Sequence, residues 1–148
     1  MDADEVVTFL EALPARTGKL ATVRPDGRPH VAPIWYALDR STVGPDSPIG
    51  DLVINTGATS VKARNIGGEP NVALCVDDDR PPFTFVTVDG AATISEEPDE
   101  LLHWCTVIGG RYMGSDQAEA LGARNAVPGE LLVRIRPIHI VALAGISD

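Results

Sequence analysis

The stretch Leu52-Val-Ile-Asn-Thr-Gly-Ala-Thr-Ser-Val-Lys-Ala-Arg-Asn65 contains the pattern that decides the fold. Its first three residues are an apolar run that predicts a strand, and Thr59 or Ser60 can cap a short helix that ends near residue 66. Lys62 and Arg64 lie at the start of that helix, where backbone N–H groups and cations together can bind an anion. Because no P-loop spacing is present, the stretch predicts either a phosphate site or an ordinary capped surface helix.

Short strands separated by turn signals lie on both sides of this stretch. Residues 19–24 and 30–38 flank the turn sequence Pro25-Asp-Gly-Arg28, which predicts a hairpin. Further strands are expected at residues 71–76 and 83–95 and in a last segment, 131–142, that bends around Pro137. We interpret Asp89-Gly90 as a β-bulge within one long strand, because apolar alternation continues after it.

The predicted helices are inserted among the strands and do not alternate with them. The pattern predicts a first helix from a cap at Asp4 to about residue 13, a helix beginning at Pro98 that Gly109-Gly110 interrupts, and another over residues 115–124. About six strands with inserted helices favour a closed antiparallel barrel over a doubly wound parallel sheet. We therefore expect a mainly β fold, a six-stranded antiparallel barrel, in a single domain spanning residues 1–148.

Composition limits the functions that the chain can perform. The net charge of −9 argues against non-specific nucleic-acid binding, although a local cation cluster can still hold a small anion. No apolar run reaches the ~20 residues that span a bilayer, and the N-terminus is acidic, so a cytoplasmic protein is expected. Cys75 and Cys105 lie in apolar patterns and are expected to be buried thiols. The run Asp77–Asp79 lacks the spacing of a calcium loop and is expected to be a solvated turn, so no metal site is predicted.

Four segments in order resemble the pyridoxamine 5′-phosphate oxidase-like split β-barrel superfamily, also called the FMN-binding split barrel. The hairpin from Leu20 to Trp35 resembles its first hairpin, Asn55 to Asn65 its phosphate-binding turn and helix, and Pro70 to Val76 the strand that follows. The later segments, Arg111-Tyr112 and Pro128 to Arg134, resemble the branch that uses the deazaflavin coenzyme F-420 and occurs mainly in actinobacteria. The resemblance covers roughly residues 5–142.

This resemblance implies an obligate homodimer with the cofactor in a groove at the dimer interface. The cofactor ring would lie along the first hairpin, the phosphate would lie at the basic helix, and the partner subunit would contribute from the Arg111-Tyr112 region. The implied cofactor-binding residues are Lys19, Leu20, Ala21, Thr22, His30, Val31, Ala32, Pro33, Ile34, Trp35, Asn55, Thr56, Ser60, Lys62, Arg64, Asn65, Arg111 and Tyr112.

Helix geometry separates the two basic residues of the opening stretch. Positions i and i+2 lie about 200° apart around a helix, so Lys62 and Arg64 are expected to have different roles. We assign the phosphate to Lys62, and the other cation to a carboxylate of the coenzyme tail or to a dimer contact. Trp35 and Tyr36 should point to opposite faces of their strand, one into the core and one into the groove.

The resemblance implies an oxidoreductase that transfers a hydride from reduced F-420 to an electron-poor small acceptor such as an enone, quinone or tetrapyrrole-like molecule. His30 is either a general acid or a strand residue that packs beside the cofactor, and because no acid partner is visible we assign no catalytic residue. Two alternatives remain open: an FMN-dependent enzyme like the pyridoxamine 5′-phosphate oxidases, and a non-catalytic flavin, deazaflavin or tetrapyrrole carrier. The Tyr112 and Pro128–Arg134 segments and the lack of a C-terminal Arg-rich motif favour the deazaflavin.

Overall fold

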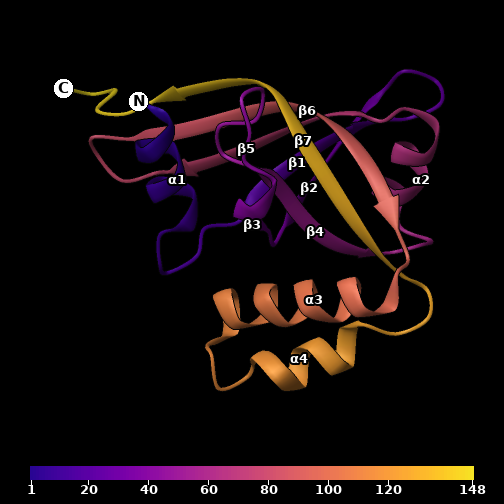
Figure 1. Ribbon diagram of the computed structural model, residues 1–148. Helices are drawn as coiled ribbons and strands as arrows, with labels where there is room; N and C mark the ends of the chain where they lie inside the picture. The colour runs from indigo at the N-terminus through magenta and orange to yellow at the C-terminus, as the bar shows by residue number, and fades with distance from the viewer.

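The computed structural model describes residues 1–148 as one strongly curved antiparallel sheet with four α-helices around it (Figure 1). The strands are β1 (Gly18–Val23), β2 (Pro29–Ile34), β3 (Ala37–Asp39), β4 (Asp51–Gly57), β5 (Asn71–Asp78), β6 (Thr84–Ser95) and β7 (Glu130–Leu143). Their order in the sheet is β2-β1-β5-β6-β7-β4-β3, so the sheet has seven strands and not the six that we predicted. The architecture is mainly β, as predicted.

The additional strand arises because the segment expected at residues 30–38 is divided in two. β2 pairs with β1 and β3 pairs with β4, and Trp35 and Tyr36 join these opposite edges of the sheet. The backbone N–H of Tyr36 donates to the hydroxyl of Tyr112 at 3.2 Å, so it is not available to a neighbouring strand. A side chain 76 residues away in sequence thus marks the end of the ladder, which local periodicity cannot show.

The irregularity expected near Asp89-Gly90 is present, but the additional residue lies on the partner strand. β6 is one long strand, as predicted, and it pairs with β7 with a shift between Asp89 and Gly90. Asp89 lies opposite His139 and Gly90 opposite Pro137, which leaves Ile138 without a partner. A Cβ atom on Gly90 would lie 2.9 Å from the carbonyl oxygen of Arg136, so glycine permits this close approach.

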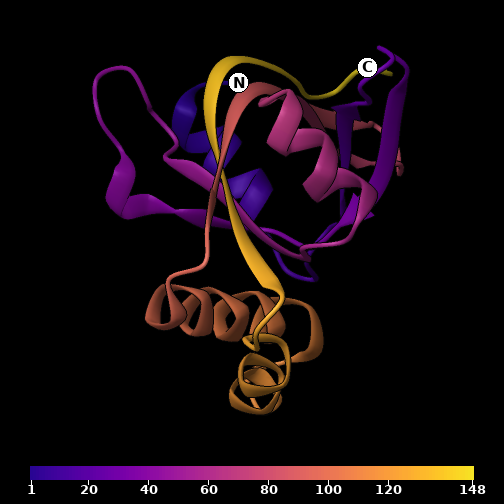
Figure 2. The ribbon, with the colours of Figure 1, turned by 90° about the vertical axis from the view of Figure 1, so that its right-hand side faces the viewer.

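Two short helices cover the ends of the curved sheet. α1 (Ala3–Glu11) is capped by Asp2 and not by Asp4: Asp2 accepts from the backbone N–H of Glu5, whose carboxylate accepts from Asp2 in return. α2 (Val61–Gly68) has Ser60 as its N-cap, one of the two caps predicted. The two helices lie at opposite ends of the sheet in Figure 1, and Figure 2 shows the molecule from the α2 end.

A helical hairpin projects beyond the strands and lies below them in Figure 1. α3 (Pro98–Met113) is continuous through Gly109-Gly110, so the predicted interruption is wrong, and α4 (Ala118–Asn125) packs along it. A Cβ atom on Gly109 would lie 2.8 Å from the Cβ of Leu121, and one on Gly110 would lie 3.0 Å from the Cβ of Ala118. The glycines therefore serve close packing between the helices and not helix termination.

The main core lies inside the curve of the sheet and includes Leu20, Leu74, Ile54 and Tyr36, all almost fully buried. A second apolar cluster, which includes Trp104, Cys105 and Ile108, joins α3 to the outside of β3, β4 and β7. None of the helices is long and apolar enough to cross a membrane.

Candidate functional site

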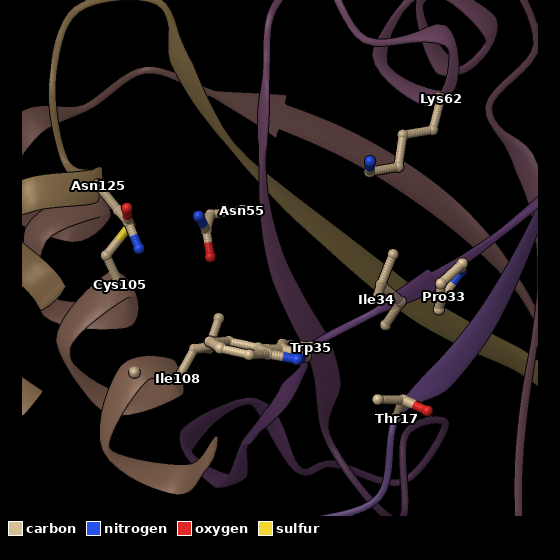
Figure 3. A pocket seen from close by; sticks show the side chains of 10 residues that line it. Thr17, Pro33, Ile34, Trp35, Asn55, Lys62, Cys105, Ile108 and Asn125 are labelled. Carbon is tan, nitrogen blue, oxygen red and sulfur yellow. The ribbon is translucent and has the colours of Figure 1, made fainter. Parts of the chain in front are cut away.

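A pocket of about 440 Å³ opens where the helical hairpin meets the sheet (Figure 3). Five parts of the chain form it: Thr17 just before β1, the end of β2 with the following Trp35, the middle of β4, the start of α2, and the facing surface of the α3–α4 hairpin. Its lining residues are Thr17, Pro33, Ile34, Trp35, Asn55, Lys62, Cys105, Ile108, Gly109 and Asn125. This volume is within the range of small-molecule sites.

The flat wall of the pocket is the indole of Trp35, whose side chain is stacked on Tyr112. The two rings are parallel within 2° at a centroid distance of 4.8 Å, and Trp35 is 40% exposed. The hydroxyl of Tyr112 donates to the carbonyl of Arg16 at 2.7 Å and accepts from the N–H of Tyr36. Tyr36 itself is fully buried, so the pair is divided between core and pocket, as predicted. Trp35 thus presents a supported aromatic face to the pocket.

Lys62 supplies the positive charge of the pocket. It is the second residue of α2, and its ammonium group makes no hydrogen bond or ion pair within the chain. The helix start is ordered by Ser60, whose hydroxyl accepts from the N–H of Ala63 and bonds to the Thr56 hydroxyl at 3.0 Å. In Figure 3 the Lys62 side chain extends toward the space above Trp35. An unpaired cation at a helix start in a pocket is suited to an anionic group.

Asn55 lies between the Lys62 side and the helical side of the pocket (Figure 3). Its side-chain nitrogen donates to the Oε2 of Glu130 on β7 at 2.8 Å. The wall opposite Lys62 consists of Cys105, Ile108 and Gly109 of α3 together with Asn125 of α4.

Five of the predicted cofactor residues line this pocket, and thirteen do not. Those that line it are Pro33, Ile34, Trp35, Asn55 and Lys62. On β1, Leu20 is part of the core, Lys19 pairs with Asp77 at 2.9 Å, and Thr22 is buried. Ala21 and Thr22 border a different, shallow hollow. On β2, Val31 is 66% exposed and points away from the core, whereas His30 and Ala32 face the other side of the strand and are half-buried.

The remaining residues of the opening stretch have structural contacts. Asn65 is buried, and its amide donates to the hydroxyl of Thr22 at 3.0 Å, which ties α2 to β1. Thr56 and Ser60 bond to each other beside the helix start. Arg64 is exposed, its guanidinium makes no hydrogen bond or ion pair within the chain, and it lies outside the pocket. The two cations of α2 are therefore in different environments, as helix geometry predicted.

Arg111 and Tyr112 make their contacts inside their own chain. The guanidinium of Arg111 donates to the carbonyls of Tyr36, Leu10 and Glu11, and so binds the C-terminal end of α1. Burial raises the pKa of Tyr112 above its ordinary value, although the hydrogen bond from Tyr36 and the positive charge of Arg111 act in the opposite direction. Within one chain, this pair supports the pocket wall from behind.

Two titratable groups near the site bear on proton transfer: His30, which the sequence offered as a possible general acid, and Cys105. The Nδ1 atom of His30 is buried and makes no hydrogen bond, and the residue does not line the pocket. Cys105 does line the pocket, and burial together with the nearby carboxylate of Glu130 raises its pKa to about 11, so the thiol is neutral at pH 7. Apart from Lys62, the pocket wall therefore has no ionised side chain.

Sequence reasoning did not identify half of the pocket wall: Thr17, Cys105, Ile108, Gly109 and Asn125. Cys105 and Ile108 belong to the apolar stripe of a predicted helix, and such a stripe indicates packing and not a ligand site. Only the position of the helical hairpin against β4 brings these residues to the same cavity as Lys62. The Pro128–Glu130 turn provided no signal that Glu130 would reach Asn55.

Comparison with known proteins gives a consistent family and fold. The family model described as pyridoxamine 5′-phosphate oxidase matches residues 3–141. A conserved hypothetical protein from Mycobacterium tuberculosis is 28% identical, with a TM-score of 0.82 over 99% of this chain and 87% of that one. An F-420 reductase is 29% identical, with a TM-score of 0.62 over 85% of this chain and 89% of that one.

A more distant neighbour extends the fold comparison. A pyridoxamine 5′-phosphate oxidase-related, FMN-binding protein from Nostoc punctiforme is 20% identical, with a TM-score of 0.66 over 95% of this chain and 81% of that one. At this identity the likeness concerns the fold alone. No protein of curated function matches the sequence.

Proposed function

Because the chain belongs to the pyridoxamine 5′-phosphate oxidase family, we propose that it is an oxidoreductase that uses the deazaflavin coenzyme F-420. It would transfer a hydride from the reduced coenzyme to an electron-poor small organic acceptor, such as an enone, a quinone or a tetrapyrrole-like molecule. The family and the split-barrel fold make a flavin-type cofactor the natural ligand. The 29% identity to an F-420 reductase, over most of both chains, supports the deazaflavin.

One observation supports this proposal above the others: an unpaired ammonium group and an open aromatic face share one pocket. Lys62 is suited to the phosphate of the coenzyme, and Trp35, supported by Tyr112, is suited to a planar ring. Pro33 and Ile34 add an apolar border beside the ring position. A flavin-type molecule combines an anionic phosphate with a planar ring, so the residues of this pocket fit the coenzyme.

The coenzyme supplies the hydride chemistry when it is bound, and the chain supplies binding and orientation. Lys62 holds the anionic group at one side of the pocket, away from the carboxylate of Glu130 near the other side. Trp35 fixes the plane of the ring. The pocket wall presents a neutral thiol and no carboxylate, so we assign no general acid or base.

The proposal includes a homodimer with the groove at the interface. The convex face of β2, β1, β5 and β6 carries the small or apolar side chains Val31, Ala21, Ala73 and Cys75, which alternate with the buried core residues. The ion pair Lys19–Asp77 and the exposed Asp89 lie on the same face. A hollow of about 390 Å³ lies over this surface. Pro33 lies on the same face and also lines the candidate pocket, so a second copy placed here would border the cofactor site.

FMN is the second candidate cofactor, because the pyridoxamine 5′-phosphate oxidases, whose family model matches this chain, use FMN. Purified protein titrated with F-420 and with FMN, followed by fluorescence, distinguishes the two. We expect tighter binding of F-420 and oxidation of its reduced form by at least one acceptor in a panel of enones, quinones and tetrapyrroles. Tight binding of FMN alone would contradict the choice of coenzyme. Tight F-420 binding without turnover would instead favour a carrier.

The role of Lys62 is tested by removing its charge. We expect Lys62→Ala to weaken binding of the phosphorylated cofactor about tenfold to a hundredfold, because a charge-assisted hydrogen bond contributes roughly 1.5–3 kcal/mol. The sharper readout is the preference for each phosphorylated cofactor over its phosphate-free form, such as FMN over riboflavin, which should nearly vanish.

Arg64→Ala is the comparison for this prediction, since it removes the same charge from the same helix. The guanidinium of Arg64 lies outside the pocket, so the preference for the phosphorylated form should change less than about threefold. Equal losses in the two variants would show that the overall charge of α2, and not the Lys62 contact, attracts the phosphate.

A further inference from the structure

We propose that the pair Asn55–Glu130 is a fixed hydrogen-bond acceptor that selects a ring carrying an N–H group. This inference rests on the proposed function, since it concerns the ring of the flavin-type cofactor in the pocket above Trp35. It adds a specificity-determining residue, Asn55, and a positioning residue, Glu130, which reaches the pocket only through Asn55.

The orientation of the Asn55 amide follows from its partner. The Oε2 of Glu130 lies 2.8 Å from the side-chain nitrogen of Asn55. An ionised carboxylate accepts hydrogen bonds and cannot donate them, so the NH₂ end of the amide must face Glu130. The carbonyl end, Oδ1, is then directed away from Glu130 and accepts no hydrogen bond from the chain. In Figure 3 this oxygen points into the space above the indole of Trp35.

The backbone holds Glu130 in the position from which it can orient Asn55. β4 and β7 pair so that Glu130 lies opposite Gly57, and Asn55 is the diagonal neighbour on the same face. Gly57 has no side chain, and a Cβ atom there would lie 3.8 Å from Oε1 of Glu130, so the carboxylate lies over the open backbone. The turn before it is fixed as well, because the N–H of Glu130 donates to the carbonyl of Val127.

The pocket therefore presents complementary groups to a ligand in a definite order. Lys62 lies on one side and attracts an anion, whereas the carboxylate of Glu130 behind Asn55 repels it. An anionic ring compound is thus oriented with its phosphate toward Lys62 and its ring toward Trp35 and Asn55. The rings of FMN and F-420 both contain an imide N–H, a donor of the kind that Oδ1 of Asn55 needs. A ring with only acceptors on that edge would leave Oδ1 of Asn55 without a hydrogen-bond donor or facing another acceptor, which costs binding free energy.

The experiment compares FMN and the F-420 chromophore phosphate with their N3-methyl derivatives, which lack this N–H. We expect the wild-type protein to bind whichever parent ring it prefers about fivefold to fiftyfold more tightly than the methylated one. Asn55→Ala should abolish the discrimination. Glu130→Ala should reduce it below about threefold, because the amide can rotate, while Glu130→Gln retains an acceptor for the Asn55 nitrogen and should retain most of it.

Glu119→Ala is the matched control, since it removes an exposed carboxylate on α4 outside the pocket. It should leave the ratio of the affinities for the parent ring and its N3-methyl derivative unchanged. If the wild-type protein binds a parent ring and its N3-methyl derivative with equal affinity, this inference is overturned and the proposed function stays intact. The inference is also overturned if the Asn55→Ala variant prefers the parent ring over its N3-methyl derivative as strongly as the wild type does. Failure of both parent rings to bind would instead overturn the proposed function, and this inference with it.

Discussion

At the scale of single residues, Tyr112 contributes both to the pocket wall and to the region where β2 ends. Its ring supports Trp35, and its hydroxyl joins the carbonyl of Arg16 to the N–H of Tyr36. The same hydroxyl occupies the position where the ladder of β2 ends. One side chain of α3 therefore shapes the pocket wall and lies at the break between β2 and β3.

Removing this hydroxyl tests its structural role. Tyr112→Phe keeps the ring on Trp35 but leaves the Tyr36 N–H without its partner. We expect the free energy of unfolding to fall by about 1–3 kcal/mol, because an unpaired buried donor is costly. Denaturant titration measures the change. Because the phenyl ring can still stack on Trp35, the change in the free energy of unfolding reports on the hydroxyl alone. An unchanged free energy of unfolding would mean that the hydroxyl is not needed to end the strand.

At the scale of elements, the α3–α4 hairpin is the part of the fold that completes the pocket. Gly122 of α4 meets Thr106 of α3 so closely that an added methyl group would collide with the Thr106 side chain. We expect Gly122→Ala to separate the helices, to cost about 1–3 kcal/mol of stability, and to weaken cofactor binding, since both helices line the pocket.

Gly67→Ala in α2 is the control for this prediction, because nothing lies within 4 Å of the added Cβ. This control variant should be neutral or up to about 1 kcal/mol more stable, as expected for alanine in a helix. Denaturant titration and cofactor titration of both variants measure the two effects. Unimpaired binding by Gly122→Ala would show that the hairpin does not form part of the site.

The second element-scale feature is an ionic clamp that joins β7, β3 and α3. The guanidinium of Arg134 donates to Asp39 at 2.8 Å and to Glu100 at 2.6 Å, and Asp51 lies 3.7 Å away. Burial raises the pKa of Asp39, but hydrogen bonds from Ser41 and Arg134 outweigh it, so this pKa is lower than usual. Burial raises the pKa of Asp51, and its repulsion from Asp39 adds to this shift.

We expect Arg134→Met to cost about 2–3 kcal/mol at pH 7, less than the ~3–5 kcal/mol of a fully buried pair, since the clamp is partly exposed. In the wild type, the lowered pKa of Asp39 stabilises the fold above pH ~4, and this contribution is lost as the pH falls through the folded-state pKa. The raised pKa of Asp51 acts in the opposite sense.

Without Arg134 the pKa values of Asp39 and Asp51 rise, because Arg134 lowers both of them in the wild type, so the folded variant takes up protons more readily as the pH falls. The difference in free energy of unfolding between the wild type and Arg134→Met should therefore become smaller as the pH is lowered from 7 to about 4. Denaturant titration at both pH values measures this change, with Arg124→Met on α4 as control, since Arg124 is exposed and lies outside the clamp. A deficit that does not depend on pH would indicate lost packing against Trp104 and not lost charge pairing.

At the scale of the whole molecule, the proposed dimer accounts for the uncovered face of the sheet. Ala73 lies in the middle of this face, on β5 between β1 and β6. Ala73→Arg should shift the protein to the monomer in sedimentation experiments, because an arginine side chain in place of a methyl group prevents a second copy from packing closely on this face. Ala120→Arg on exposed α4 should leave the oligomeric state unchanged. A wild-type protein that sediments as a monomer would contradict the dimer.

The sequence by itself determined the mainly β architecture, the long β6, the Ser60 cap and the separate environments of Lys62 and Arg64. These features depend on alternation, turn residues and helical angles, which act over a few neighbours in the chain. It also identified Lys62, Asn55 and Trp35, which the structure brings to one pocket. The family resemblance is confirmed by the match over residues 3–141.

Only the tertiary structure decided the rest, since the contacts responsible join residues far apart in sequence. The hydroxyl of Tyr112 lies at the break between β2 and β3, and α4 explains why Gly109-Gly110 does not interrupt α3. The contact between Asn55 and Glu130 spans 75 residues and depends on the β4–β7 register. Local patterns specify what each segment becomes, whereas the assembled sheet and hairpin decide which side chains share a cavity.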